Sequence, residues 1–249
     1  MKIPLVRRLA AEWIGTGFLV AAVVGSGIMG ERLSGGNTAL ALLVNTIATG
    51  AALVALILAF GPISGAHFNP IVTLTDAWEG GTRWNDAPGY IISQIFGGVS
   101  GTITAHLMFG LPLISLSHHV RGGPAQVFSE FIATFGLLAV ILGCSRARSR
   151  ATAFAVGSYI AAAYWFTAST SFANPAVTIA RSLSDTFSGI RPADSPGFIG
   201  AQLAGGFAAA LIFRWLSPLP LVRPGEASAS RGALRQALES NPSDSVGQG

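Results

Sequence analysis

The sequence predicts an all-α integral membrane protein in which six transmembrane helices and two re-entrant half-helices form an inverted repeat. Three observations lead to this fold class. The chain of 249 residues is 51% apolar and only 10% charged, whereas soluble proteins average about 25% charged residues. Its second half repeats motifs of its first half in the same order. An Asn-Pro pair lies late in a long uncharged stretch of each half.

The uncharged stretches predict the six transmembrane spans. Most of them hold about 20 helical residues, the length that crosses a hydrocarbon core. The stretch 131–145 is shorter, so its helix is expected to begin near Pro124 and to include Glu130. Two stretches are longer than one span requires, and both carry the Asn-Pro pair near their far end. No Asp, Glu, Lys or Arg occurs in 13–30, 33–75, 87–120, 131–145, 151–180 and 195–213.

The N-terminal segment is expected to remain as the first transmembrane helix. Met1 to Arg8, followed by an apolar run, also fits a secretory signal. Glu12 and the lack of a small-residue cleavage site argue against that alternative.

The basic residues predict that both termini lie in the cytoplasm, because cytoplasmic loops are enriched in Lys and Arg. With six spans both termini share one side, and four basic residues lie on the other: Arg32, Arg121, Arg181 and Arg191. The terminal side holds the other eleven: Lys2, Arg7, Arg8, Arg83, Arg146, Arg148, Arg150, Arg214, Arg223, Arg231 and Arg235. We expect a multi-pass protein of the inner (plasma) membrane. The scattered basic residues form no continuous face for nucleic acid.

Three motifs recur in the second half. They are AEWIGT at 11–16 and SEFIAT at 129–134, NPIVTL at 69–74 and NPAVTI at 174–179, and SQIFGG at 93–98 and AQLAGG at 201–206. Each half has an odd number of spans, so the second copy is inverted relative to the first. The repeats are expected over about 8–110 and about 124–217 of one membrane domain, 1–217. A disordered cytoplasmic tail, rich in Pro, Ser and Gly, is expected over 218–249.

Each Asn-Pro pair predicts the start of a short helix. Proline suits a first helical turn because its missing donor would be unpaired there, and Asn is among the best N-cap residues. The pairs follow expected breaks at 61–65 and 169–171. About ten residues remain before the next break, enough to cross half a membrane at 1.5 Å per residue.

Two half-helices entering from opposite faces predict a pore at the membrane centre. Their positive N-terminal ends repel cations, while the amides of Asn69 and Asn174 donate to a passing neutral molecule. The non-helical backbone before each Asn is tolerable at this depth only where it lines a wet cavity. Its carbonyls, which we expect to accept from the solute, belong to Gly65, Ala66, His67, Phe68, Thr170, Ser171, Phe172 and Ala173. We therefore expect a passive channel for small uncharged solutes, without a cofactor.

Glu12 and Glu130 are expected to brace the two re-entrant loops. Carboxylates inside a bilayer are costly, so both should face the protein interior and bind backbone donors there. A proton relay through them is the alternative. His67 is expected to contribute only its backbone, because no partner lies at metal-ligand spacing. The single Cys144 excludes an intramolecular disulfide.

These motifs resemble those of the aquaporin (major intrinsic protein) family over residues about 5–217. The matching segments are AEWIGT at 11–16, GAHFNP at 65–70 and NPA at 174–176. The resemblance implies an aquaporin-like channel domain and a homotetramer with one pore per subunit. The implied pore signature is Asn69, Pro70, Ile71, Asn174, Pro175 and Ala176. The chain looks like the bacterial aquaglyceroporin-like branch associated with arsenic resistance.

The chain departs from the family pattern at two positions. Ile71 stands where the family usually has Ala, and it is expected to repack or narrow the centre. Val177 stands where the family usually has an arginine that donates to solutes at an outer constriction. The other constriction positions implied by spacing are Thr49, Ala162 and Ser171. Water-selective members have Phe and His there and glycerol-conducting members keep the arginine, so we expect a wider filter for polyols or metalloid hydroxides such as arsenite, with water as a further solute.

Arg181 is the candidate to replace the missing arginine. It lies four residues after Val177 on the same helix face, and helical side chains lean toward the N-terminus. Its guanidinium is therefore expected at the outer mouth of the pore. The alternatives are a snorkelling arginine at a helix end and an ion pair with Asp185.

Three other functions are weighed against this channel. A water-selective aquaporin shares the fold. An ion-coupled secondary transporter also uses inverted repeats and broken helices, but only Glu12 and Glu130 could hold a coupling ion at the midplane. An intramembrane enzyme would need a nucleophile with its base, and no His or Lys accompanies the Ser and Thr residues. We expect no enzymatic activity, and partners limited to neutral solutes, the lipid bilayer and further copies of the chain.

Overall fold

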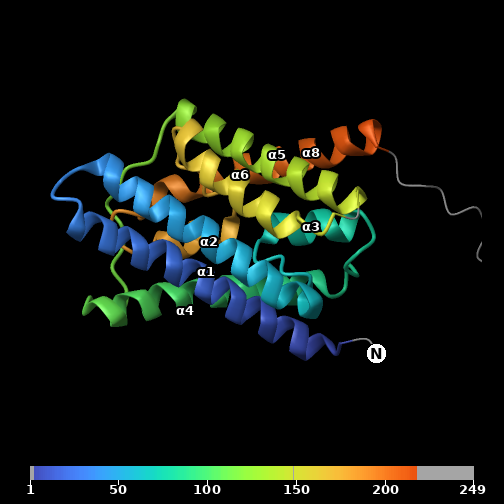
Figure 1. Ribbon diagram of the computed structural model, residues 1–249, viewed down its shortest axis with the longest axis horizontal. Helices are drawn as coiled ribbons and strands as arrows, with labels where there is room; N and C mark the ends of the chain where they lie inside the picture. The colour runs from blue at the N-terminus through green and yellow to red at the C-terminus, as the bar shows by residue number, and fades with distance from the viewer. Residues whose placement is uncertain (1–2, 148, 218–249) are drawn as a thin grey trace, which may run out of the picture. The chain divides into compact units, whose positions relative to one another are not determined.

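The protein is a bundle of helices arranged as two successive copies of one unit. The computed structural model describes residues 3–147 and 149–217. No strand occurs in these described ranges. The tail predicted over 218–249 lies outside them. The helices are α1 (Leu5–Leu33), α2 (Thr38–Ser64), α3 (Pro70–Trp78), α4 (Ala87–Phe109), α5 (Pro124–Arg146), α6 (Thr152–Phe166), α7 (Pro175–Arg181), η1 (Pro192–Asp194) and α8 (Ser195–Leu216) (Figure 1).

Five of the long helices are apolar enough to cross a membrane, namely α1, α2, α4, α5 and α8 with the short η1 before it. As predicted, α5 begins at Pro124 and contains Glu130. The sixth expected span is α6, whose 15 residues extend only about 22 Å at 1.5 Å per residue. It is therefore shorter than the hydrocarbon core of about 30 Å. The half-helices α3 and α7 have 9 and 7 residues.

Equivalent helices pair in equivalent ways in the two halves. Helix α1 packs against α2 and α4, and α5 packs against α6 and α8, while α2 and α6 join the halves. The first glycine of the repeated Gly-Gly motif allows a close approach in each half. A Cβ on Gly97 would lie 2.4 Å from the Trp13 carbonyl oxygen of α1, and one on Gly205 would lie 2.4 Å from the Phe131 carbonyl oxygen of α5. The motif therefore marks a backbone-to-backbone helix contact in both copies.

We expect Gly205→Ala to lower the free energy of unfolding by about 1 to 3 kcal/mol, because the added methyl group overpacks against rigid backbone. The loss of stability is measured by heating the detergent-purified protein and recording, by size-exclusion chromatography, how much folded protein remains at each temperature. Gly200→Ala on the same helix is the control, since a Cβ at Gly200 meets no atom within 4 Å. Equal losses for the two variants would contradict this packing argument.

Helix α2 ends later than the sequence predicted. The expected break over 61–65 was wrong at its start, because the helix continues through Pro62 and ends at Ser64. Pro62 removes the hydrogen bond to the Leu58 carbonyl and its ring crowds that carbonyl, and the helix continues for only two residues after it. Gly65, at φ 92°, then takes the left-handed conformation that ends the helix, and its N–H donates to the Gly61 carbonyl at 3.0 Å.

Candidate functional site

Asn69 and Asn174 are the N-caps of the two half-helices. The side-chain oxygen of Asn69 accepts a hydrogen bond from the Ile71 N–H at 3.1 Å, and that of Asn174 accepts from the Ala176 N–H at 3.0 Å. Both residues have extended backbone, with φ of −153° and −157°. Each side-chain oxygen is therefore used inside its own helix, and only the amide nitrogen is directed elsewhere.

The two amide nitrogens join the halves by reciprocal hydrogen bonds. Asn69 Nδ2 donates to the Ala173 carbonyl at 2.8 Å, and Asn174 Nδ2 donates to the Phe68 carbonyl at 2.8 Å. The N-terminal ends of α3 and α7 consequently meet. A side-chain amide has two N–H groups, so each Asn keeps a second donor that is not used in its reciprocal bond.

The loops before the two Asn residues have matching left-handed backbone. Ala66 and Phe68 in the first loop have φ of 51° and 52°, and Ser171 and Ala173 in the second have φ of 50° and 49°. Such φ values are costly for residues other than glycine and cluster at functional sites. No described residue donates a hydrogen bond to the carbonyls of 65–67 or 170–172. The loops therefore carry a row of unclaimed acceptors beside the Asn donors.

Glu12 holds the first loop from α1. One of its carboxylate oxygens accepts hydrogen bonds from Ser64 Oγ at 2.6 Å and the His67 N–H at 3.0 Å. The other accepts from the Phe68 N–H at 2.7 Å and Gln94 Nε2 at 2.8 Å. Glu12 is fully buried, and these donors compensate the cost of burying its charge.

Glu130 holds the second loop from α5 in the same way. Its carboxylate accepts from the Phe172 N–H at 2.9 Å, the Ala173 N–H at 2.8 Å and Gln202 Nε2 at 2.6 Å. Gln202 also donates to Thr178 Oγ1 at 2.9 Å, as Gln94 does to Thr73 Oγ1 in the first half. Because every carboxylate oxygen is occupied by loop or amide donors, this arrangement suits bracing better than proton transfer.

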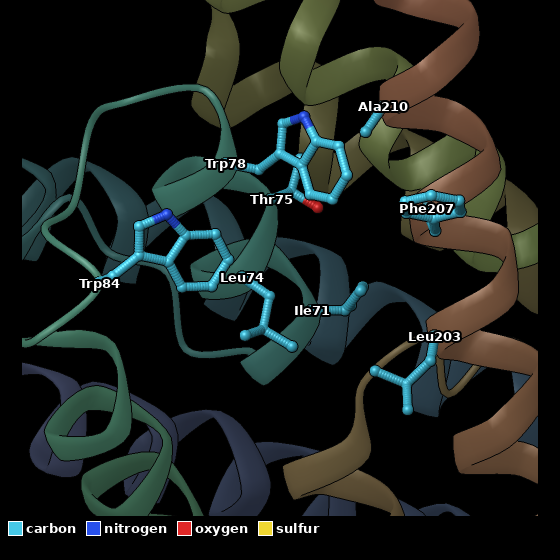
Figure 2. Close-up of a pocket in the computed structure, with 8 residues that line it drawn as sticks. All are labelled: Ile71, Leu74, Thr75, Trp78, Trp84, Leu203, Phe207 and Ala210. Atoms are coloured by element: carbon cyan, nitrogen blue, oxygen red, sulfur yellow. The ribbon is translucent and has the colours of Figure 1, made fainter.

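Ile71 points away from the contact between the two Asn residues. Its side chain leans on α8, where a Cβ on Gly206 would meet Ile71 Cγ1 at 2.3 Å. Figure 2 shows it directed toward Leu203 and Phe207 of the same helix. The larger residue at this signature position therefore repacks the space beside α8 and does not narrow the centre.

Thr49 is buried inside the bundle, whereas Ala162 is exposed. Thr49 is 3% exposed, and its hydroxyl lies 3.3 Å from that of the buried Tyr164 on α6. Ala162 falls on the exposed stripe of α6 that also contains Phe154 and Trp165. Residues spaced three or four apart share a helix face, and exposure alone does not show whether this face lines a pore, so the filter position at Ala162 stays a prediction. Tyr164 is the buried α6 residue whose hydroxyl lies beside that of Thr49.

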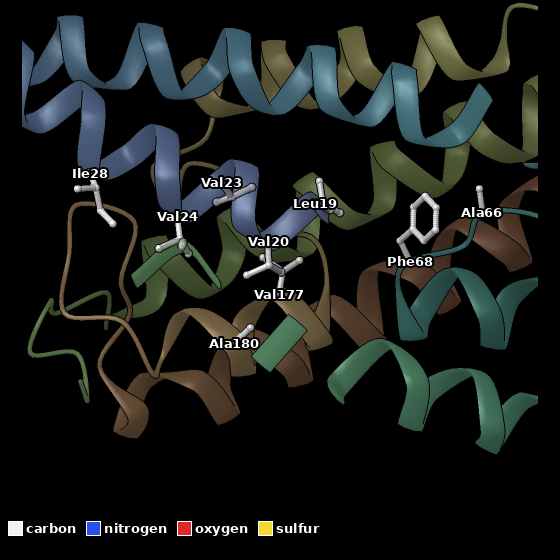
Figure 3. Packing of buried hydrophobic residues seen from close by; sticks show 10 residues of the cluster. Leu19, Val20, Val23, Val24, Ile28, Ala66, Phe68, Val177 and Ala180 are labelled. Carbon is white, nitrogen blue, oxygen red and sulfur yellow. The ribbon is translucent and has the colours of Figure 1, made fainter. Parts of the chain in front are cut away.

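Val177 and Ser171 are both buried near the start of α7. Val177 is 5% exposed and belongs to an apolar cluster with Val20 and Val24 of α1 (Figure 3). The Ser171 hydroxyl, also buried, has no hydrogen-bond partner among the described residues. An arginine at position 177 would carry five donors. This chain instead has the isopropyl group of Val177 and, nearby in the sequence, the unpaired hydroxyl of Ser171.

Arg181 is buried at the end of α7, with 1% exposure. Its Nε donates to the Ser188 carbonyl, and its guanidinium carbon lies 3.4 Å from the centroid of the Phe172 ring. The alternative of an ion pair with Asp185 was wrong, because that carboxylate accepts from the His118 N–H at 2.8 Å and lies 3.0 Å from His118 Nδ1. The hydrogen bond from the His118 backbone lowers the pKa of Asp185. Burial also excludes a snorkelling role for Arg181.

Arg121 is a second buried arginine at this place, and sequence reasoning missed it. Its Nε donates to the Gly189 carbonyl at 2.7 Å, and Nη1 lies 3.3 Å from Thr170 Oγ1. Its guanidinium carbon lies 5.2 Å from the Phe172 centroid, so Phe172 contacts both Arg121 and Arg181. Burial lowers the pKa of Arg121 to about 10, which leaves it charged at neutral pH. No local motif identifies it, because its partners lie 48 to 68 residues away in sequence.

His67 has a side-chain contact beyond the backbone role predicted for it. Its Nδ1 lies 3.1 Å from Thr73 Oγ1, and its Nε2 lies 3.5 Å from a carboxylate oxygen of Asp76. These contacts tie the first loop to the half-helix that follows it. Within the described ranges, no group of three or more His, Cys, Asp or Glu residues is placed to hold a metal ion.

Comparisons with known sequences agree with this geometry. The sequence profile of the family described as Major intrinsic protein matches residues 1–153 and 143–240. Aquaglyceroporin AqpS of Rhizobium meliloti (strain 1021) is 57% identical over 212 residues, which cover 85% of this chain and 91% of that protein. Aquaporin NIP1-1 of Arabidopsis thaliana is 33% identical over 172 residues, which cover 64% of this chain and 57% of that protein.

A solved structure has the same architecture. The aquaglyceroporin from Plasmodium falciparum superposes with a TM-score of 0.67 at 20% identity, over 84% of this chain and 96% of that one. At this identity the likeness supports the fold alone. The two profile matches together span most of the sequence and include both Asn-Pro half-helices. From its braced loops, its paired Asn N-caps and these matches, the chain belongs to the major intrinsic protein family.

Proposed function

We propose that this protein is a passive channel for small uncharged solutes such as glycerol, and that metalloid hydroxides such as arsenous acid are among them. The observation that carries the proposal is the pair of Asn amides, each with one donor left over, beside unclaimed carbonyls on both loops. A row of donors and acceptors replaces the hydration of a neutral, hydroxylated solute step by step. The name of the relative AqpS, an aquaglyceroporin, supports the same class of solute.

The centre of this pore disfavours cations. Two half-helix N-termini meet there with positive ends, and both buried carboxylates are occupied by hydrogen-bond donors of the protein. A coupled transporter needs free ligands for its driving ion at this depth. Transport through this chain is therefore passive, and we assign it no enzymatic step.

The outer filter of the proposed pore combines Thr49, Tyr164, Ser171 and Val177. Val177 contributes no donor, so passage depends on the few hydroxyl groups and on the width of the opening. Arg181, one turn further out, and Arg121 supply positive charge at the mouth in place of the arginine usual at position 177. This arrangement favours neutral solutes bulkier than water and disfavours a strict water filter.

In the cell we place the protein in the inner membrane with both termini in the cytoplasm, as its distribution of basic residues favours. We also expect a homotetramer with one pore in each subunit, which is the assembly implied by the family resemblance. Residues 1–217 then form the channel domain.

The filter proposal is tested by restoring the usual residue. Val177→Arg is expected to slow glycerol and arsenous acid entry about tenfold, which corresponds to an added barrier of about 1.4 kcal/mol. Water permeability should fall much less, because water passes a narrower opening. Stopped-flow light scattering on proteoliposomes measures the three solutes in parallel.

Val177→Leu is the matched control, since it adds volume without charge or donors. It should have a smaller effect than Val177→Arg on every solute. An equal loss of water and glycerol permeability in Val177→Arg would argue against a size filter at this position.

A further inference from the structure

A cleft opens between α3 and α8 on the surface of the bundle. Its volume is about 270 Å³. Leu74 and Trp78 of α3 line one side, with Trp84 beside Leu74, and Leu203, Phe207 and Ala210 of α8 line the other (Figure 2). Trp78, Trp84, Leu203 and Phe207 are 38 to 55% exposed, so the cleft is accessible from outside the subunit.

The cleft runs along α3 from mid-membrane depth toward one membrane surface. Ile71 lies at its deep end, two residues after the Asn that marks the centre. Trp78 lies seven residues later, about 10 Å along a helix axis at 1.5 Å per residue. Tryptophans at the shallow end suit the interface between lipid tails and headgroups. The direction and length of the cleft therefore match the part of one acyl chain that lies nearest its headgroup, within a single leaflet.

Basic residues surround the shallow end of the cleft. Arg214 lies one turn beyond Ala210 on α8, and its guanidinium carbon lies 5.5 Å from the centroid of the Trp78 ring. Glu79 is shared between Arg214, at 3.3 Å, and Arg146, at 2.8 Å. Arg83 precedes Trp84, is exposed, and forms no ion pair with any described residue. Two other carboxylates belong to this segment: Asp86 pairs with Arg8 at 2.8 Å, and Asp76 lies 3.5 Å from His67 Nε2. Arg83, Arg146 and Arg214 still outnumber Glu79 and Asp76, so the rim keeps a positive excess.

We propose that this cleft binds an anionic phospholipid, with one acyl chain lying between α3 and α8 and the phosphate at Arg83 and Arg214. An open apolar groove on a membrane-spanning surface is filled by whatever apolar chain surrounds it, because an empty groove loses packing contacts. A neutral lipid would supply the chain without matching the positive rim. A second copy of the subunit would bring its own surface to the groove and would not need this charge.

The test uses the full-length protein in detergent with phosphatidylglycerol that carries bromine on its acyl chains, which quenches tryptophan fluorescence on contact. We expect quenching at low lipid-to-protein ratios in the native protein. The quenched fraction should largely disappear in Trp78→Phe/Trp84→Phe. It should persist in Trp13→Phe, which changes an exposed tryptophan of α1.

Charge variants test the headgroup contact separately. Arg83→Gln/Arg214→Gln should raise the phosphatidylglycerol concentration for half-maximal quenching about tenfold or more, as the loss of two basic residues near an anionic surface predicts. Arg7→Gln/Arg191→Gln removes two charges elsewhere and should leave that concentration unchanged. Brominated phosphatidylcholine should bind the native protein as weakly as phosphatidylglycerol binds the Arg83/Arg214 variant.

Three results would overturn the proposal. One is native quenching that survives the Trp78/Trp84 replacement. Another is equal binding of phosphatidylcholine and phosphatidylglycerol. The third is the absence of quenching at any lipid ratio, which would mean that another copy of the subunit covers the cleft.

Discussion

Glu130→Gln is expected to remove most of the folded protein and nearly all solute flux. The carboxylate accepts hydrogen bonds from the Phe172 N–H, the Ala173 N–H and Gln202 Nε2. An amide at this place would set an N–H₂ group against one of these donors and leave buried donors unpaired. The cost is about 3 kcal/mol or more for groups bound to a charge, a large part of the 5 to 15 kcal/mol that stabilises a typical domain.

The monodisperse yield after size-exclusion chromatography measures the folding loss, and proteoliposome swelling measures the flux of the protein that survives. Glu31→Gln is the control, because Glu31 is exposed at the end of the neighbouring repeat's first helix. Native yield and native glycerol flux in Glu130→Gln would contradict the bracing role.

Arg181→Met is expected to raise proton leak and glycerol permeability severalfold. Methionine retains much of the side-chain volume beside Phe172 while removing the charge and the donor to the Ser188 carbonyl. A buried positive charge at a pore mouth is an electrostatic barrier to protons and cations. The somewhat smaller and more flexible methionine also leaves more room for glycerol at the mouth. A pH-sensitive dye trapped inside the vesicles measures proton entry, and light scattering measures glycerol entry in the same vesicles.

Arg191→Met is the matched control for charge removed from the same stretch of chain. Arg191 is exposed and paired with Asp194 at 2.8 Å, so neither permeability should change. If Arg181→Met leaves both proton and glycerol permeability at native values, Arg181 does not replace the usual filter arginine.

The elements that sequence predicted well depend on local rules. An Asn-Pro pair specifies a helix start wherever it lies, because the cap and the missing proline donor act within one turn. The structure accordingly begins α3 at Pro70 and α7 at Pro175. The recurrent Gly-Gly motif indicated a repeat, and the structure adds that its first glycine allows the close helix contacts at Gly97 and Gly205.

The residues that sequence placed wrongly or could not place depend on geometry across non-helical segments. Ala162 was counted back from Asn174 through the loop 167–173, where the regular helical spacing does not hold, so the count does not fix which residue of α6 reaches the filter. Pro62 marked a helix end about one turn too early. The direction of the Ile71 side chain depends on the space left by Gly206 on α8. The residue type at position 71 does not specify that direction.

Arg121 escaped prediction for a related reason. It lies in the connection between the two halves, and every group that it binds belongs to the second half. Only the folded chain brings it beside Phe172 and Arg181. The positive charge that we propose for the pore mouth is therefore larger than the single candidate arginine in the sequence indicated.

The central claim is that neutral solutes cross this protein passively. Its most direct test is stopped-flow light scattering on proteoliposomes of the full chain with inward gradients of glycerol, arsenous acid and water, repeated after ionophores collapse the sodium and proton gradients. We predict glycerol and arsenous acid entry well above that of protein-free liposomes and unchanged by the ionophores. Entry at the protein-free rate, or entry that stops when either ion gradient is collapsed, would contradict the claim.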